Sequence, residues 1–205
     1  MRQIVVIPSS PALIEGVSPN DEGSARLRAA AQAVLGECAA QARSIGVVCA
    51  ASEECRTELT GSLSAWAPGA ELACAQGGQL LGEIIARLLL GESEQKITGC
   101  AEEIATLVDA DLVIVTADGP VTLTDRAPGG YHPDAEKAFG FLRAMLNGED
   151  VHGWTTEDLL SVGVIDPQPW MDIFALRDQS SACQVCAHDT TGGVGRLVAK
   201  WEMVN

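Results

Sequence analysis

Residues 3–11 read QIVVIPSSP, an uninterrupted β-branched and apolar run that stops at Pro8. A short apolar run ended by a helix and strand breaker predicts a buried strand. Comparable runs recur at residues 45–50 and 112–115. Wholly apolar strands are typical of parallel sheets, because helices cover both faces of such sheets. The three runs therefore predict the centre of a parallel sheet.

Segments with apolar residues at helical spacing lie between and after these runs. A stretch rich in Gly, Ser and Pro, residues 52–78, predicts a loop with short elements. Two alternating strands, at residues 182–189 and 195–204, predict a hairpin that reverses at Gly192, Gly193 and Gly195. The expected helices cover residues 24–42, 79–90, 101–108, 133–147 and 155–160, with a further short helix from Trp170.

These elements predict an α/β fold in which residues 1–205 form one domain. We expect a central, mainly parallel sheet with helices on both faces and a C-terminal β-hairpin.

The charge of the chain excludes several classes of partner. Its formal net charge is −15, which disfavours binding to nucleic acid or to an anionic membrane surface. The first ten residues, MRQIVVIPSS, do not predict a secretory signal, because the apolar run meets Pro8 too early. The seven cysteines are therefore expected to be reduced thiols, and the protein to be cytoplasmic.

Two loops are candidates for a binding site. One follows the first strand as Pro8-Ser9-Ser10-Pro11, and the other runs from Asp118 to Gly130 after the third apolar run. Ligands of open α/β sheets bind beyond the carboxyl ends of the strands, where both loops should lie. The same residue types also occur in turns chosen only for their backbone geometry, and the pattern leaves that alternative open.

Few residues are suited to catalysis. The histidines are His132, His152 and His188, and none precedes residue 132. The pair Cys183 and Cys186 resembles a redox or metal motif, but alternation along a strand turns Cys183 away from Cys186 and leaves Cys186 on the face of His188. A serine nucleophile at Ser9 or Ser10 could combine with His188 or His132 and with Asp118 or Asp189, although no nucleophile-elbow motif is present.

Three segments together resemble the class III extradiol ring-cleavage dioxygenases (catalytic subunit) and their Memo-like relatives. The segments are IVVIPSSPALI at residues 4–14, VIVTADGPVTLTDRAPGGYHPDAEKAF at 113–139 and HDTTGGVGRLVAKWEM at 188–203. They occur in the family's order and span the chain, and the stretch APGGYHPDAEKAF is the most specific. Active members of that family hold ferrous iron with two histidines and one carboxylate.

The resemblance implies a site that has lost its iron ligands. The first ligand histidine falls on Ser9, and the second should lie near residues 49–53, where no histidine occurs. The acid/base histidine falls on Val121, and the carboxylate falls on Asp189. The resemblance thus implies no iron cofactor, because a single carboxylate without imidazole partners is a poor ferrous site.

We therefore expect a non-catalytic, dioxygenase-like protein that keeps its cleft for a small molecule or for a partner protein. The resemblance also implies a homodimer, because the related fold often forms dimers. The alternative is an enzyme of another kind, either a metal-dependent oxidoreductase using Asp118, His188 and Asp189 or a serine-dependent hydrolase. Flat polar side chains and hydroxyls suit a small polar or aromatic ligand. The predicted cleft residues are Ser9, Ser10, Asp118, Gly119, Tyr131, His132, His188 and Asp189.

Overall fold

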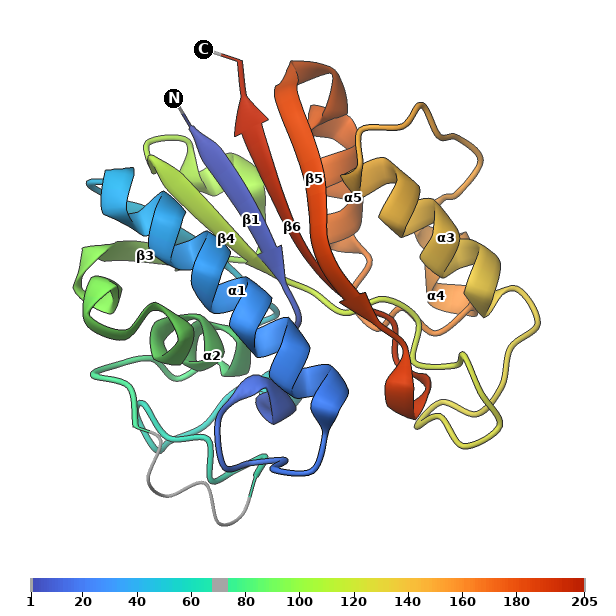
Figure 1. The fold of residues 1–205 in the computed structure, drawn as a ribbon, viewed down its shortest axis with the longest axis horizontal. Helices are drawn as coiled ribbons and strands as arrows, with labels where there is room; N and C mark the ends of the chain where they lie inside the picture. The colour runs from blue at the N-terminus through green and yellow to red at the C-terminus, as the bar shows by residue number, and fades with distance from the viewer. Residues whose placement is uncertain (1, 68–73, 205) are drawn as a thin grey trace.

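In the computed structural model, which describes residues 2–67 and 74–204, six strands form one mixed sheet (Figure 1). Their order across the sheet is β3-β2-β4-β1-β6-β5. The first four of these run parallel, and β6 lies antiparallel to both β1 and β5. The bounds are β1 (Gln3–Ile7), β2 (Ile45–Val48), β3 (Ile97–Ala101), β4 (Leu112–Thr116), β5 (Ser180–Asp189) and β6 (Arg196–Met203).

Helices cover both faces of this sheet. In Figure 1, α1 and α2 lie on one side of the strands, and α3, α4 and α5 lie on the other. The bounds are α1 (Glu22–Gln41), α2 (Leu81–Leu90), α3 (Ala135–Leu146), α4 (Thr156–Ser161) and α5 (Gln168–Leu176). This arrangement confirms the predicted α/β fold, including the antiparallel C-terminal hairpin of β5 and β6.

The apolar run of β1 supplies both cores of the protein. Its side chains alternate, so Val5 and Ile7 pack under α1 and α2 while Ile4 and Val6 pack under α3 and α5. All five residues of β1 and all five of β4 are buried. Burial on two faces explains why these strands read as continuous apolar runs.

One predicted helix is wrong. Residues 101–108 do not form an α-helix; the segment begins as the end of β3 and continues as a short 3₁₀ turn, η4 (Ile104–Leu107). Strand β3 pairs in parallel with β2 and takes residues 97–101 into the sheet. Between β3 and β4, residues 102–111 form this 3₁₀ turn and irregular backbone instead of an α-helix. Helical spacing of apolar residues there reflects the packing of Ile104 and Ala110 into the core.

The longest helix begins two residues earlier than its apolar pattern predicts. Asp21 caps α1, because its carboxylate accepts a hydrogen bond of 2.9 Å from the backbone amide of Ser24. Aspartate at this position satisfies an amide that has no partner inside the helix. Across the described ranges, no helix combines the length and the apolar character that a membrane span requires.

Candidate functional site

A cavity of about 200 Å³ opens at the carboxyl edge of the sheet, where β1, β2 and β4 end. Its walls are mainly apolar, and its polar groups come from the loops that follow the strands. This is the position at which open α/β sheets bind their ligands. The described lining residues are Ser9, Ala50, Cys55, Leu81, Gly82, Thr116, Ala117, Asp118, Gly119, Val121, Ile165 and Asp166.

Ser9 and Asp118 form the polar centre of this cavity. The Ser9 hydroxyl donates a hydrogen bond of 2.5 Å to Oδ2 of Asp118, which joins the two loops predicted from sequence. The other carboxylate oxygen, Oδ1 of Asp118, is buried and has no hydrogen-bond partner among the described residues. A buried polar atom without a partner costs about 1–3 kcal/mol, so this oxygen is an unusual feature that calls for an explanation.

The backbone of the Asp118 loop is held in place on two sides. The indole Nε1 of Trp170, a fully buried residue of α5, donates a hydrogen bond of 3.0 Å to the carbonyl of Asp118. The next amide, that of Gly119, donates to the carbonyl of Gly195 at 2.7 Å. These contacts tie the loop to both α5 and the start of β6, so the carboxylate is presented from a rigid position.

Burial raises the pKa of the Asp118 carboxyl above its ordinary value, because a charge is poorly solvated there. The hydrogen bond from Ser9 and the positive charge of Arg196 act in the opposite direction and offset part of this effect. A second lining carboxyl, Asp166, has its pKa raised by burial and by repulsion from Glu102 and Asp172. Two carboxyls with raised pKa values in one cavity are typical of a functional site.

Three predicted cleft residues lie outside the described lining of the cavity. Ser10 caps the short 3₁₀ helix η1 (Pro11–Leu13), since its hydroxyl accepts from the amide of Ala12. Tyr131 is exposed. His132 accepts a hydrogen bond at Nδ1 from the amide of Asp134, next to the start of α3. The sequence analysis thus assigned to one cleft three residues that the structure places outside the cavity lining.

His188 and Asp189 also lie outside the cavity lining, and they point to opposite faces of the sheet. His188 makes an edge contact with Phe139 of α3, at 6.4 Å between ring centroids, and lines a separate surface hollow with it. Asp189 is buried on the α1 side, where a Cβ added at Gly23 would lie 2.5 Å from its Oδ1. The metal site suggested for Asp118, His188 and Asp189 is therefore not assembled.

The expectation that Cys186 shares a face with His188 is wrong. The register of β5 shifts between Val185 and Ala187, a β-bulge at Cys186. Cys186 and Ala187 consequently both pack toward the α1 core, whereas Cys183 and Val185 pack on the α3 side. The separation of Cys183 from Cys186 is confirmed, but the extra residue of the bulge turns His188 to the other face.

Asp189 belongs to a buried network rather than to the cavity. Arg196 donates to its Oδ2 at 2.6 Å and to the hydroxyl of Ser24 at 2.5 Å. Arg26 approaches the other oxygen at 3.3 Å. This network ties the hairpin of β5 and β6 to the start of α1, and the opposite charges of its buried groups compensate one another.

The geometry excludes a Ser-His-Asp triad at Ser9. None of the three histidines, all of which are described, lines the cavity, and His152 pairs with the exposed Asp150 at 2.9 Å. Within the described ranges, no three His, Cys, Asp or Glu side chains converge as a metal site would require. The Ser9 hydroxyl donates to a carboxylate without an imidazole to take up its proton.

Sequence reasoning missed several residues of the cavity wall. Gly82 lies where α2 passes close to Thr116, and a Cβ at this glycine would be 2.7 Å from that of Cys49. Ile165 and Asp166 come from the loop before α5. Gly82 lies within a segment of helical periodicity and has no turn signal beside it. Asp166 precedes Pro167, as many ordinary turn residues do. Neither position therefore had a sequence pattern that marked it as part of a binding site.

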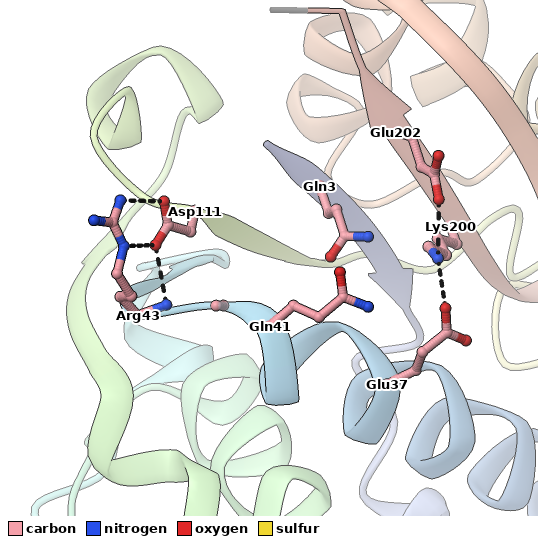
Figure 2. A pocket seen from close by; sticks show the side chains of 8 residues that line it. Gln3, Glu37, Gln41, Arg43, Asp111, Lys200 and Glu202 are labelled. Atoms are coloured by element: carbon pink, nitrogen blue, oxygen red, sulfur yellow. Dashed lines mark hydrogen bonds and ion pairs between the residues drawn. The ribbon is translucent and has the colours of Figure 1, made fainter. Parts of the chain in front are cut away.

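A second, polar cavity of about 290 Å³ lies at the amino edge of the sheet (Figure 2). Its charged groups are paired with one another: Lys200 bridges Glu37 and Glu202, and Arg43 binds Asp111 through two contacts of 3.0 and 3.2 Å. Groups already satisfied in this way offer little to a ligand. The cavity at the carboxyl edge is therefore the stronger candidate site.

No family model matches the chain, and no curated protein matches it.

Proposed function

We propose that this protein binds a small organic molecule in the cavity around Ser9 and Asp118 and does not carry out iron-dependent ring cleavage. One observation carries the proposal: Asp118, whose buried Oδ1 has no hydrogen-bond partner among the described residues, lines an apolar cavity at the carboxyl edge of the sheet. Ligand sites commonly combine apolar walls with a few fixed polar groups. A ligand that donates a hydrogen bond to this oxygen would remove its desolvation cost.

The family resemblance supports a cleft at the same place. The positions onto which two of the family's histidines fall, Ser9 and Val121, both line the cavity, and so does Ala50 from the segment expected to hold the remaining one. These residues do not fit ferrous iron, because they supply a hydroxyl and two apolar side chains where imidazoles are needed. Asp189, the position of the family's carboxylate, is engaged by Arg196 instead.

Binding without hydrolysis agrees with the environment of Ser9. A serine nucleophile needs a neighbouring base that accepts its proton and is itself oriented by a third group. Among the residues that the structure describes, the Ser9 hydroxyl is hydrogen-bonded to Asp118, and no imidazole lines the described cavity. The pair is therefore better suited to orienting a ligand than to attacking it.

A fragment screen by ¹H–¹⁵N NMR on the full chain tests this proposal. We expect hits to shift the amides of Ser9, Ala50 and Gly119, and the variant Ala50→Leu to abolish these shifts by filling the cavity. Ala182→Leu is the matched control, since it adds the same atoms to an exposed position on β5. A screen without hits, or hits that Ala50→Leu leaves unchanged, would overturn the proposal.

A further inference from the structure

We infer that the ligand of this cavity is a small cationic amine with an apolar body, an inference that rests on the proposed function and specifies its ligand class. The observation behind it is that two carboxyl residues, Asp118 and Asp166, line a cavity whose other described lining residues are uncharged. Asp118 stands at the end of β4, and Asp166 stands in the loop before α5. No lysine or arginine is among the described lining residues.

The charge around the cavity is not neutralised by the protein itself. Arg196 is the cation whose charge acts on Asp118, but its guanidinium is held by Asp189 and lies 3.6 Å from Asp21. Asp166 accepts one long backbone hydrogen bond, of 3.4 Å, from Gln168, and it is repelled by two further carboxyls, Glu102 and Asp172. The described surroundings thus carry more negative than positive charge.

This imbalance selects the charge of the ligand. An anionic ligand would be repelled by the ionised carboxyls, whereas a cationic ligand would favour their charged forms, which burial disfavours. An ammonium group has three donors and no acceptor, so it can donate to the free Oδ1 of Asp118 while neutralising the carboxylate. Charge-assisted hydrogen bonds of this kind are roughly twice as strong as neutral ones.

The size and walls of the cavity select the rest of the ligand. Leu81, Val121 and Ile165 provide apolar contact surface around the two carboxyls. A dry cavity of roughly 150 Å³ is large enough for benzene. The volume of about 200 Å³ therefore fits one ring, or an aliphatic chain of similar bulk, with a single amine.

Three probes with the same ring test this inference: benzylamine, benzyl alcohol and benzoate, each titrated into the full chain by NMR at neutral pH. We expect benzylamine to bind at least tenfold more tightly than either of the others, with shifts at Ser9 and Gly119. Asp166→Asn should weaken benzylamine binding by about tenfold, which corresponds to 1.4 kcal/mol. Asp109→Asn removes the same charge from an exposed position before β4 and should leave binding unchanged.

The outcomes separate this inference from the proposed function. If benzyl alcohol or benzoate binds in the cavity as tightly as benzylamine, or if Asp166→Asn has no effect, the amine class is wrong and the binding function stands. The amine class is also wrong, and the binding function stands, if only uncharged or anionic fragments of the screen occupy the cavity. If neither the probes nor any fragment binds there, the proposed function itself fails.

Discussion

Asp189 and Arg196 face each other across the base of the β5–β6 hairpin, with Oδ2 of the aspartate 2.6 Å from a guanidinium nitrogen and both side chains almost fully buried. Their backbones are paired in the antiparallel register of the two strands. The position that the family resemblance assigns to an iron-binding carboxylate is thus occupied by a structural ion pair. The charge of Asp189 is used to fix the hairpin against α1.

Replacing Asp189 with asparagine should strongly destabilise the protein. Removing one partner of a buried ion pair leaves the other charge uncompensated and typically lowers the free energy of unfolding by about 3–5 kcal/mol. Urea unfolding monitored by circular dichroism measures the change. Asp134→Asn, which breaks the exposed pair with Lys137, is the control and should cost no more than about 1 kcal/mol. Equal losses in the two variants would show that the Asp189 pair is not buried in solution.

Replacing Asp118 with asparagine should stabilise the protein increasingly as the pH rises. The pKa of Asp118 is raised in the folded state, mainly by burial, with Ser9 and Arg196 lowering it in part. An acid whose pKa is raised on folding stabilises the folded state at pH values below its pKa in the unfolded chain, about 3.9. This stabilisation is lost as the pH rises through its pKa in the folded protein. The difference in unfolding free energy between Asp118→Asn and the unmodified protein should therefore grow from pH 4 toward neutrality.

Asp111→Asn provides a control of opposite sign. Its exposed carboxyl is bound by Arg43, which lowers its pKa to about 2. An acid whose pKa is lowered on folding stabilises the folded state at pH values above its pKa in the unfolded chain. This stabilisation is lost as the pH falls toward its pKa in the folded protein. The loss of unfolding free energy caused by Asp111→Asn should therefore become smaller as the pH falls from 4 to 2. A pH-independent difference for Asp118→Asn would mean that this carboxyl is solvated.

Gly82 should not tolerate alanine, because the added Cβ would collide with the Thr116 hydroxyl and lie 2.7 Å from the Cβ of Cys49. Overpacking of this kind costs about 1–3 kcal/mol, and here it would also narrow the binding cavity. Gly36→Ala is the matched control in a helix interior. Nothing lies within 4 Å of its Cβ position, so it should gain about 0.5–1 kcal/mol in unfolding free energy. Thermal unfolding of both variants gives the comparison.

The protein should have no specific ferrous iron site at Asp118. The cavity offers carboxyls and hydroxyls without an imidazole, so Asp118→Asn should leave anaerobic iron affinity unchanged within error when measured by equilibrium dialysis. A variant with histidine at both family positions, Ser9→His with Val121→His, should bind iron at least tenfold more tightly. Stoichiometric iron in the unmodified protein, together with catechol-dependent oxygen uptake, would refute the proposed loss of this chemistry.

Local sequence patterns predicted most of the fold, because the helices and central strands are marked by residues close together in the chain. The apolar run of β1, the helical spacing of α1 and the glycines of the C-terminal reversal each record a burial or turn requirement at their own position. Strand β3 was missed for the opposite reason. It forms at the edge of the sheet by pairing with β2, and its sequence, ITGCA, contains no run of apolar residues that signals such pairing.

Sequence analysis predicted correctly only those cavity residues that directly follow a strand. Ser9, Asp118 and Gly119 follow β1 and β4 directly, so parallel topology was enough to bring them together. Tyr131 and His132 lie further along an irregular loop, and one inserted residue in β5 decided which face His188 occupies.

The sequence by itself determined the layers of this protein and the edge at which its loops converge, because alternation and helical periodicity are properties of the chain. The tertiary structure alone decided that Asp189 faces Arg196, that Gly82 and Asp166 enclose the cavity, and that Oδ1 of Asp118 is left without a partner. Apart from the Asp189–Arg196 pair, which spans seven residues of one hairpin, these relationships join segments separated by tens of residues. Their burial energies exist only once those segments have packed.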